Sequence, residues 1–126
     1  MPVKYSLAQR PNPSDPAAPK KFYATAKSEG EMTLRELANQ IGAISTVSSI
    51  DTLAVLESLL QVIPGELLNG RIVRLGEFGS FRITLESEGA DTAEDFNKSL
   101  IKRAKLNFRP GKLIANALKT ADYQKA

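Results

Sequence analysis

Two segments repeat apolar residues at intervals of three and four, which places those residues on one side of a helix. The first covers residues 33–42 and opens with Thr33 and Glu36 at capping-box spacing. The second covers residues 48–68, starts at a serine and contains Pro64, where we expect a kink. Its apolar stripe is wide enough to contact both its own domain and a partner chain. A helix buried in a monomeric core has the same periodicity, so the pattern leaves both arrangements open.

Alternation with period two follows the helical segments and predicts strands. Residues 71–85 alternate on either side of the glycine-containing turn GEFGS (residues 76–80), and residues 101–109 alternate again. A proline and a glycine then interrupt the pattern, and residues 111–121 return to helical spacing. Helices and strands in this order predict an α+β domain.

The N-terminal region has a different pattern. Residues 3–9 and 22–27 alternate loosely, and the connection over residues 10–20 contains four prolines. This pattern predicts a hairpin-like extension over residues 1–32, before a domain at residues 33–126. A mostly disordered leader is the competing interpretation.

Composition excludes several classes of function. The chain has no cysteine and no histidine, which excludes a disulfide framework, thiol catalysis and the usual zinc ligands. The paired acids Glu94–Asp95 and Glu86/Glu88 have no accompanying nucleophile and base, and GEFGS lacks the lysine of a phosphate-cradling loop. We therefore expect no enzymatic activity, no cofactor, no metal and no small-molecule substrate. Apolar runs are too short to span a membrane, so we expect a soluble cytoplasmic protein.

The charge is unevenly distributed along the chain. The net charge is only +3, but residues 98–126 carry eight bases and one acid, whereas residues 83–97 carry five acids and no base. A basic C-terminal third is consistent with a local anion-binding face. An ordinary solvated surface has the same composition, and charge alone favours that simpler interpretation.

The strand at residues 101–109 makes the case for nucleic acid more specific. Arg103, Lys105, Asn107 and Arg109 occupy alternate positions, so they share one face at a spacing of roughly 6.5–7 Å. Such a row can follow a phosphate backbone. An exposed sheet face guarded by charge against aggregation has the same pattern, and the spacing favours neither interpretation.

Two short motifs carry a family resemblance. RIVRLGEFGSFR (residues 71–82) and NFRPGK (residues 107–112), with two helices upstream, resemble the bacterial histone-like family of HU and integration host factor. The resemblance covers about residues 33–120 and is consistent with a variant subfamily that has an N-terminal extension. It implies a two-helix base, a three-stranded antiparallel sheet with an arm, and a short C-terminal helix. It also implies a dimer, either of identical chains or with a related chain.

The resemblance implies that double-stranded DNA is the partner, bound through its phosphates. The turn before Phe81 would offer its backbone N–H groups to phosphates. The backbone N–H groups at the helix N-terminus near Lys112 would also favour an anion. Glu77 departs from the family, which commonly has glycine there, and its carboxylate would repel phosphate. The expected contact residues are Arg74, Gly79, Ser80, Arg82, Lys98, Lys102, Arg103, Lys105, Asn107, Arg109 and Lys112.

The arm departs most from the family. Typical members insert a proline at the arm tip into the minor groove, but residues 83–106 contain no proline and their middle is acidic. Phe96 is the only bulky apolar substitute, and packing explains it better. We therefore expect weaker or differently shaped DNA engagement than in standard HU.

The function that these features favour is sequence-independent, architectural DNA binding and DNA condensation in the bacterial nucleoid. The leading alternative is an HU-like module for protein contacts or self-assembly that binds DNA hardly at all. The acidic arm is the feature that keeps this alternative open.

Overall fold

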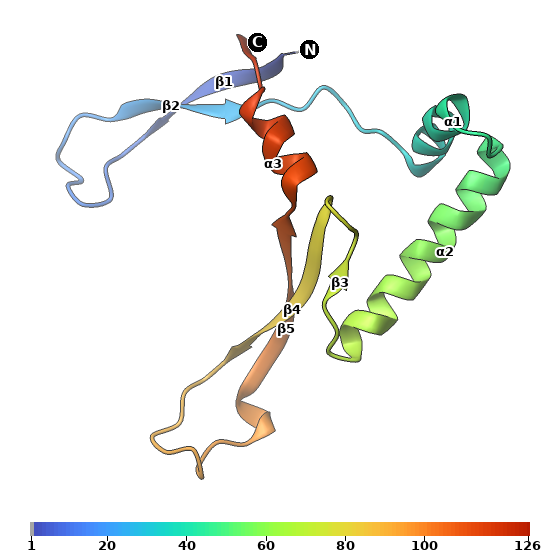
Figure 1. Ribbon diagram of the computed structural model, residues 1–126. Helices are drawn as coiled ribbons and strands as arrows, with labels where there is room; N and C mark the ends of the chain where they lie inside the picture. The colour runs from blue at the N-terminus through green and yellow to red at the C-terminus, as the bar shows by residue number, and fades with distance from the viewer. Residues whose placement is uncertain (1) are drawn as a thin grey trace. The chain divides into compact units, whose positions relative to one another are not determined.

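The computed structural model describes residues 2–126, which form three α-helices and two three-stranded sheets (Figure 1). The helices are α1 (Leu34–Ile44), α2 (Ser49–Leu68) and α3 (Lys112–Lys119). The strands are β1 (Val3–Arg10), β2 (Lys21–Ala26), β3 (Val73–Arg74), β4 (Gly79–Ser87), β5 (Ile101–Pro110) and β6 (Tyr123–Lys125). A single 3₁₀ turn, η1 (Lys98–Leu100), precedes β5. The α+β class predicted from periodicity is therefore confirmed.

The chain divides into two compact units. One consists of Leu34–Asn116, and the other combines the residues up to Thr33 with Ala117–Ala126. The first unit, called here the central unit, holds α1, α2 and the β3–β4–β5 sheet. The second, called the N-terminal unit, holds the β2–β1–β6 sheet.

Both predicted helices at the start of the central unit are present. The Ser48 hydroxyl accepts a hydrogen bond from the Asp51 N–H at 3.1 Å, which caps α2 as its sequence suggested. The two helices approach closely at Gly42, where an added Cβ would lie 3.1 Å from the Ser49 nitrogen. α2 continues through Pro64 and ends at Leu68, with Asn69 as its C-cap. The helix pair forms the base of this unit.

The sheet of the central unit is antiparallel, in the order β3–β4–β5. Phe81 lies opposite both Val73 and Phe108, and the Phe81 and Phe108 ring centroids are 4.8 Å apart. The Phe78 ring lies 5.9 Å from that of Phe108. These rings form the apolar end of the sheet.

The turn between β3 and β4 docks on the start of α3. The Gly111 N–H donates to the Phe78 carbonyl at 2.9 Å, and the Leu113 N–H donates to the Glu77 carbonyl at 3.1 Å. A Cβ at Gly111 would lie 2.7 Å from the Glu77 carbonyl carbon, so only glycine permits this approach. The proline–glycine joint in the sequence therefore closes α3 onto the turn.

In the N-terminal unit β1 is the central strand. It pairs antiparallel with β2 and parallel with β6, and the Ala126 N–H donates to the Tyr5 carbonyl at 2.9 Å. β1 and β2 form an antiparallel hairpin, and the connection between them contains the four prolines. The sequence did not predict β6, a three-residue strand that joins the chain's last residues to this sheet.

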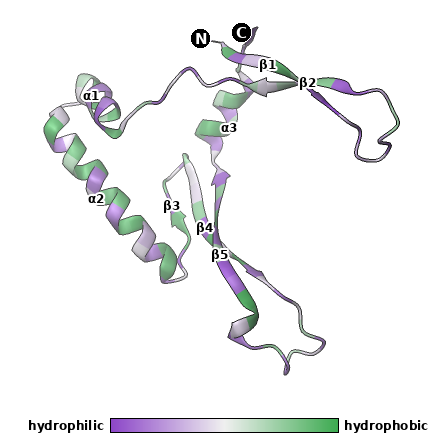
Figure 2. Ribbon diagram, turned by 180° about the vertical axis from the view of Figure 1, so that it is seen from behind, coloured by the Kyte–Doolittle hydropathy of each residue, from purple (hydrophilic) through white to green (hydrophobic). Residues whose placement is uncertain are grey.

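Little apolar surface is buried within one chain. Among residues 2–126, Ala38 and Leu67 are the only buried hydrophobic residues. Hydrophobic residues recur along α2, β4 and β5 (Figure 2). In the sheet, Leu85 and Leu106 are each 62% exposed. Large exposed apolar surfaces of this kind mark interfaces.

Candidate nucleic-acid interface

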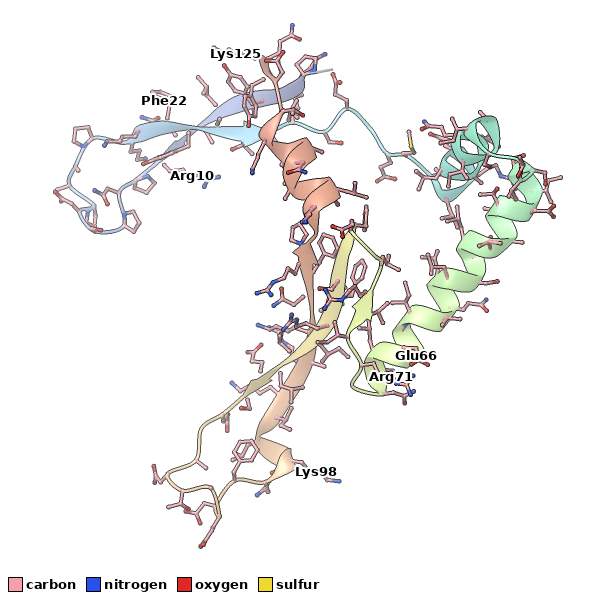
Figure 3. All side chains as sticks on the ribbon, in the orientation of Figure 1. Arg10, Phe22, Glu66, Arg71, Lys98 and Lys125 are labelled. Atoms are coloured by element: carbon pink, nitrogen blue, oxygen red, sulfur yellow. The ribbon has the colours of Figure 1, made fainter. Side chains whose placement is uncertain are left out.

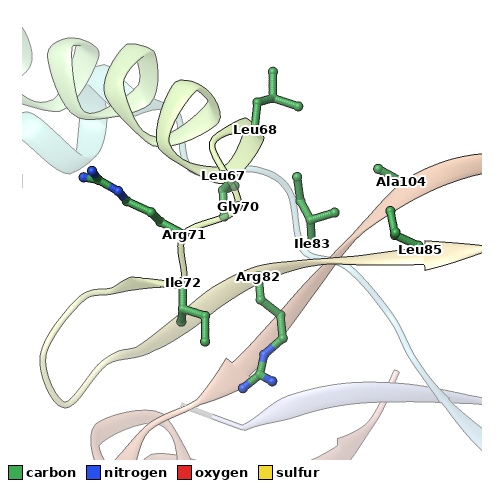
Figure 4. A pocket seen from close by; sticks show the side chains of 9 residues that line it. All are labelled: Leu67, Leu68, Gly70, Arg71, Ile72, Arg82, Ile83, Leu85 and Ala104. Carbon is green, nitrogen blue, oxygen red and sulfur yellow. The ribbon is translucent and has the colours of Figure 1, made fainter. Parts of the chain in front are cut away.

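The β3–β4–β5 sheet gathers most of the predicted contact residues on one side. Directly opposite residues in antiparallel strands point to the same side, and the register pairs Ser80 with Arg74 and Arg109, and Arg82 with Asn107. The resulting surface, called here the polar face, consists of Arg74, Ser80, Arg82, Thr84, Glu86, Arg103, Lys105, Asn107 and Arg109. The other side carries the apolar residues. In Figure 4 Arg82 and Ile83 accordingly point to opposite sides of β4.

The half of the polar face nearer the arm is neutralised within the chain. Glu86 lies opposite Arg103, and its Oε2 accepts from Arg103 Nε at 2.8 Å and pairs with Lys105 Nζ at 2.9 Å. Lys105 first, and Arg103 second, lower the pKa of Glu86 below its ordinary value of 4.5. Glu86 is therefore ionised at neutral pH and neutralises both cations.

The other half of the polar face carries cations without acidic partners. Among residues 2–126, no ion pair involves Arg74, Arg82 or Arg109. Arg82, Asn107 and Arg109 line a shallow hollow of about 380 Å³. Guanidinium groups present forked donors that match phosphate oxygens, so this half is the better anion site.

Burial removes two predicted contacts from the surface. Ser80 is only 4% exposed, and Gly79 is buried beside it. A Cβ at Gly79 would lie 2.7 Å from the Phe108 ring and 2.6 Å from the Arg109 carbonyl oxygen, so the glycine is needed for packing. This burial favours a structural role for Gly79 and Ser80 over the expected phosphate contact.

The predicted anion site at the start of α3 also needs correction. The Gly111 and Leu113 N–H groups are taken by the carbonyls of the docked turn, so neither is free for a phosphate. Lys112 remains exposed as the first residue of α3. Its contribution is limited to its side-chain charge.

The arm is the segment that connects β4 to β5. Glu88 at its start donates its N–H to the Leu100 carbonyl at 2.9 Å, and its carboxylate lies 3.8 Å from Lys102 Nζ. Lys98 opens the 3₁₀ turn and is exposed. Phe96 is 39% exposed. Lys102 is therefore partly neutralised by an acid of the arm, whereas Arg103 and Lys105 are neutralised by Glu86 of β4.

Sequence reasoning missed two members of the polar face, Thr84 and Glu86. The sequence shows that both alternate with apolar residues in β4. It does not show their neighbours on β5, because these depend on the register of the hairpin. A register counted back from the pairing of Arg82 with Asn107 would have placed Glu86 opposite Arg103. That pairing is only available once the strands are aligned in space.

Neither a metal-ligand cluster nor a membrane-spanning helix occurs within residues 2–126. The described residues contain no group of three or more His, Cys, Asp or Glu side chains that could hold a metal ion. Within the same part of the chain, no helix is long and apolar enough to cross a membrane.

The fold and the polar face define an α+β protein with a helical base and a cation-bearing antiparallel hairpin. The chain belongs to the family described as HU-HIG, "HU domain fused to wHTH, Ig, or Glycine-rich motif", whose model matches residues 1–125. The resemblance to HU drawn from the two motifs is thereby confirmed.

A solved structure shows the same fold. It is that of a protein from Bacteroides vulgatus ATCC 8482, described as a "Putative bacterial DNA binding protein", with a TM-score of 0.65 and 14% sequence identity. The alignment covers 98% of this chain and 47% of that one, so this chain spans about half the length of its solved neighbour. No curated protein matches significantly.

Proposed function

We propose that this chain is a non-enzymatic, largely sequence-independent DNA-binding protein with an architectural role in the bacterial nucleoid. Its family and its likeness in fold to a protein described as DNA-binding support the choice of partner. The observation that carries the proposal is the polar face, which brings Arg74, Arg82 and Arg109 together without acidic partners. In this proposal residues 33–126 are the DNA-binding domain and residues 1–32 its extension.

The proposed contacts are to phosphates rather than to bases. Arginine side chains on a sheet without an inserted helix supply charge and forked donors, which position a duplex without reading its sequence. Binding then depends on counterion release, so it weakens steeply with salt. We expect dissociation constants on the order of 10⁻⁴–10⁻⁶ M at physiological salt.

A dimer is part of the proposal. The side of the sheet opposite the polar face adjoins α2, and Leu67, Leu68, Ile83 and Leu85 line a groove there of about 540 Å³ (Figure 4). Leu68 is 78% exposed in the single chain. A second copy of the chain, or a related one, would cover these residues and leave the polar face open to DNA. Light scattering would then report about twice the chain mass of 13.7 kDa.

The test of DNA binding is a titration of a random 30-base-pair duplex at several salt concentrations. The double variant Arg82→Gln/Arg109→Gln removes two free cations while keeping polar side chains of related shape. For each protomer whose two arginines both contact phosphate, the slope of log K against log salt becomes shallower by about 1.8. The matched control is Arg35→Gln/Lys119→Gln, which removes the same charge from exposed side chains of α1 and α3, outside the polar face and in no ion pair among residues 2–126.

A second candidate function is a protein-interaction or structural module with little DNA binding. Glu86 and Glu88 favour it, because together they neutralise Arg103, Lys105 and Lys102. Undetectable duplex binding by the parent chain at low salt would support this candidate. It would also refute the DNA-binding proposal.

A further inference from the structure

The N-terminal sheet also has two unlike sides. The register of β1 with β2 and β6 puts Val3, Leu7, Phe22 and Tyr123 on one side. Phe22 and Tyr123 are 66% and 67% exposed. Figure 3 shows Phe22 and Arg10 on opposite sides of the two strands. The sheet therefore has an apolar side and a polar side, as the sheet of the central unit does.

The polar side of this sheet pairs cations with cations. Arg10 lies directly opposite Lys21. The Lys27 N–H donates to the Lys4 carbonyl at 2.8 Å, and by the same register Lys27 lies opposite Lys4. Tyr23, 47% exposed, lies between the two pairs. We call Lys4, Arg10, Lys21, Tyr23 and Lys27 the N-terminal cationic face.

Like charges placed directly across two strands destabilise a sheet. Glu29 relieves one pair, since its carboxylate lies 2.6 Å from Lys4 Nζ. Among residues 2–126, no ion pair involves Arg10, Lys21 or Lys27. The remaining repulsion would be relieved by an external anion bridging the cations.

The two cation pairs are separated by a distance that suits a polyanion rather than a small anion. Six residues separate Lys4 from Arg10, which is about 20 Å of strand. This is the length of about six base pairs of duplex at 3.4 Å each. The hydroxyl of Tyr23, between the pairs, is a donor of the kind that contacts phosphate oxygens.

We propose that the N-terminal cationic face is a second DNA-phosphate site, separate from the polar face of the central unit. The proposal rests on the proposed function in one respect, that the ligand of both faces is duplex DNA. Because an apolar sheet side must be covered for stability, whatever covers Phe22 and Tyr123 leaves the cationic side to the solvent. Two linked sites bind one duplex more tightly than either alone, since the second contact becomes intramolecular.

The experiment is a titration of the 30-base-pair duplex with the full chain at salt concentrations between 20 mM and 200 mM. The N-terminal variant is Arg10→Gln/Lys21→Gln, and the control is Lys119→Gln/Lys125→Gln. Both control positions lie in the same unit outside the cationic face; Lys125 pairs with Tyr5 on the apolar side. We expect the N-terminal variant to make the salt slope shallower by about 1.8 and the control to leave it at the parent value. The four side chains substituted in these two variants are exposed, and circular dichroism checks that both variants are folded.

The titration includes the Arg82→Gln/Arg109→Gln variant, so that the two proposals fail separately. A slope that changes in both variants supports both sites. A change in the Arg82→Gln/Arg109→Gln variant alone overturns the N-terminal site and leaves the proposed function intact. A change in the N-terminal variant alone supports the second site and refutes the polar face. Absence of parent binding at 20 mM salt overturns both.

Discussion

Replacing Glu86 by glutamine should strengthen DNA binding and increase its dependence on salt. Glu86 Oε2 lies 2.8 Å from Arg103 Nε and 2.9 Å from Lys105 Nζ. A duplex whose phosphates bind these two cations must therefore displace the Glu86 carboxylate. Glutamine has the same shape and carries no charge. The substitution raises the net charge of this cluster by one and frees two cations.

The size of the effect follows from counterion release. Each added phosphate contact steepens the slope of log K against log salt by about 0.9, which amounts to about eight-fold in affinity between 1 M and 0.1 M salt. One added contact therefore predicts about eight-fold tighter binding at 0.1 M, and two predict about 60-fold. Fluorescence anisotropy with a labelled random duplex at four salt concentrations measures both quantities.

Glu94→Gln is the matched control for this substitution. It makes the same change in net charge within the arm, but Glu94 belongs to none of the ion pairs among residues 2–126. If Glu86→Gln steepens the slope no more than Glu94→Gln does, the carboxylate does not compete with DNA. The interpretation of the polar face as two unequal halves would then be wrong.

Three further predictions concern stability and assembly. Gly79→Ala should lower the free energy of unfolding, measured in urea, by about 1–3 kcal/mol, because the added Cβ would lie 2.7 Å from the Phe108 ring. Gly89 has open space around it, so Gly89→Ala should lower that free energy by less than about 0.5 kcal/mol. Equal losses in the two variants would contradict the packing role of Gly79. Leu106→Glu places a charge on the apolar side of β5, where the side chain is exposed. If this side forms the dimer contact, the mass measured by light scattering should fall to that of one chain. An unchanged mass would assign the dimer contact to another surface. Because the pKa of Glu86 is lowered in the folded chain, its ion pairs stabilise the fold above the ordinary pKa of 4.5 and lose that effect as pH falls through the folded value. The Tm difference between the parent chain and Glu86→Gln should thus be constant near neutral pH and should disappear as the pH falls below 4.5. A Tm difference that persists at such acidic pH would contradict the ion-pair account.

Local periodicity in the sequence was sufficient to predict most of the elements. The spacing of apolar residues gave the two base helices, and alternation gave β4, β5 and the N-terminal hairpin. Alternation also predicted that Arg103, Lys105, Asn107 and Arg109 share a face, because successive side chains of a strand point to opposite sides. Each of these inferences depends only on the geometry of one element.

Contacts between distant residues were decided by the tertiary structure. β6 is three residues long, and its pairing with β1 joins opposite ends of the chain, so no local pattern indicates it. The partners of Glu86 depend on the register across the arm, and the burial of Ser80 depends on the packing around it. A periodic pattern shows which side of an element a residue occupies, but only the alignment of strands in space shows which charge lies opposite. In this chain that alignment separates the cations that Glu86 neutralises from those of the polar face without an acidic partner.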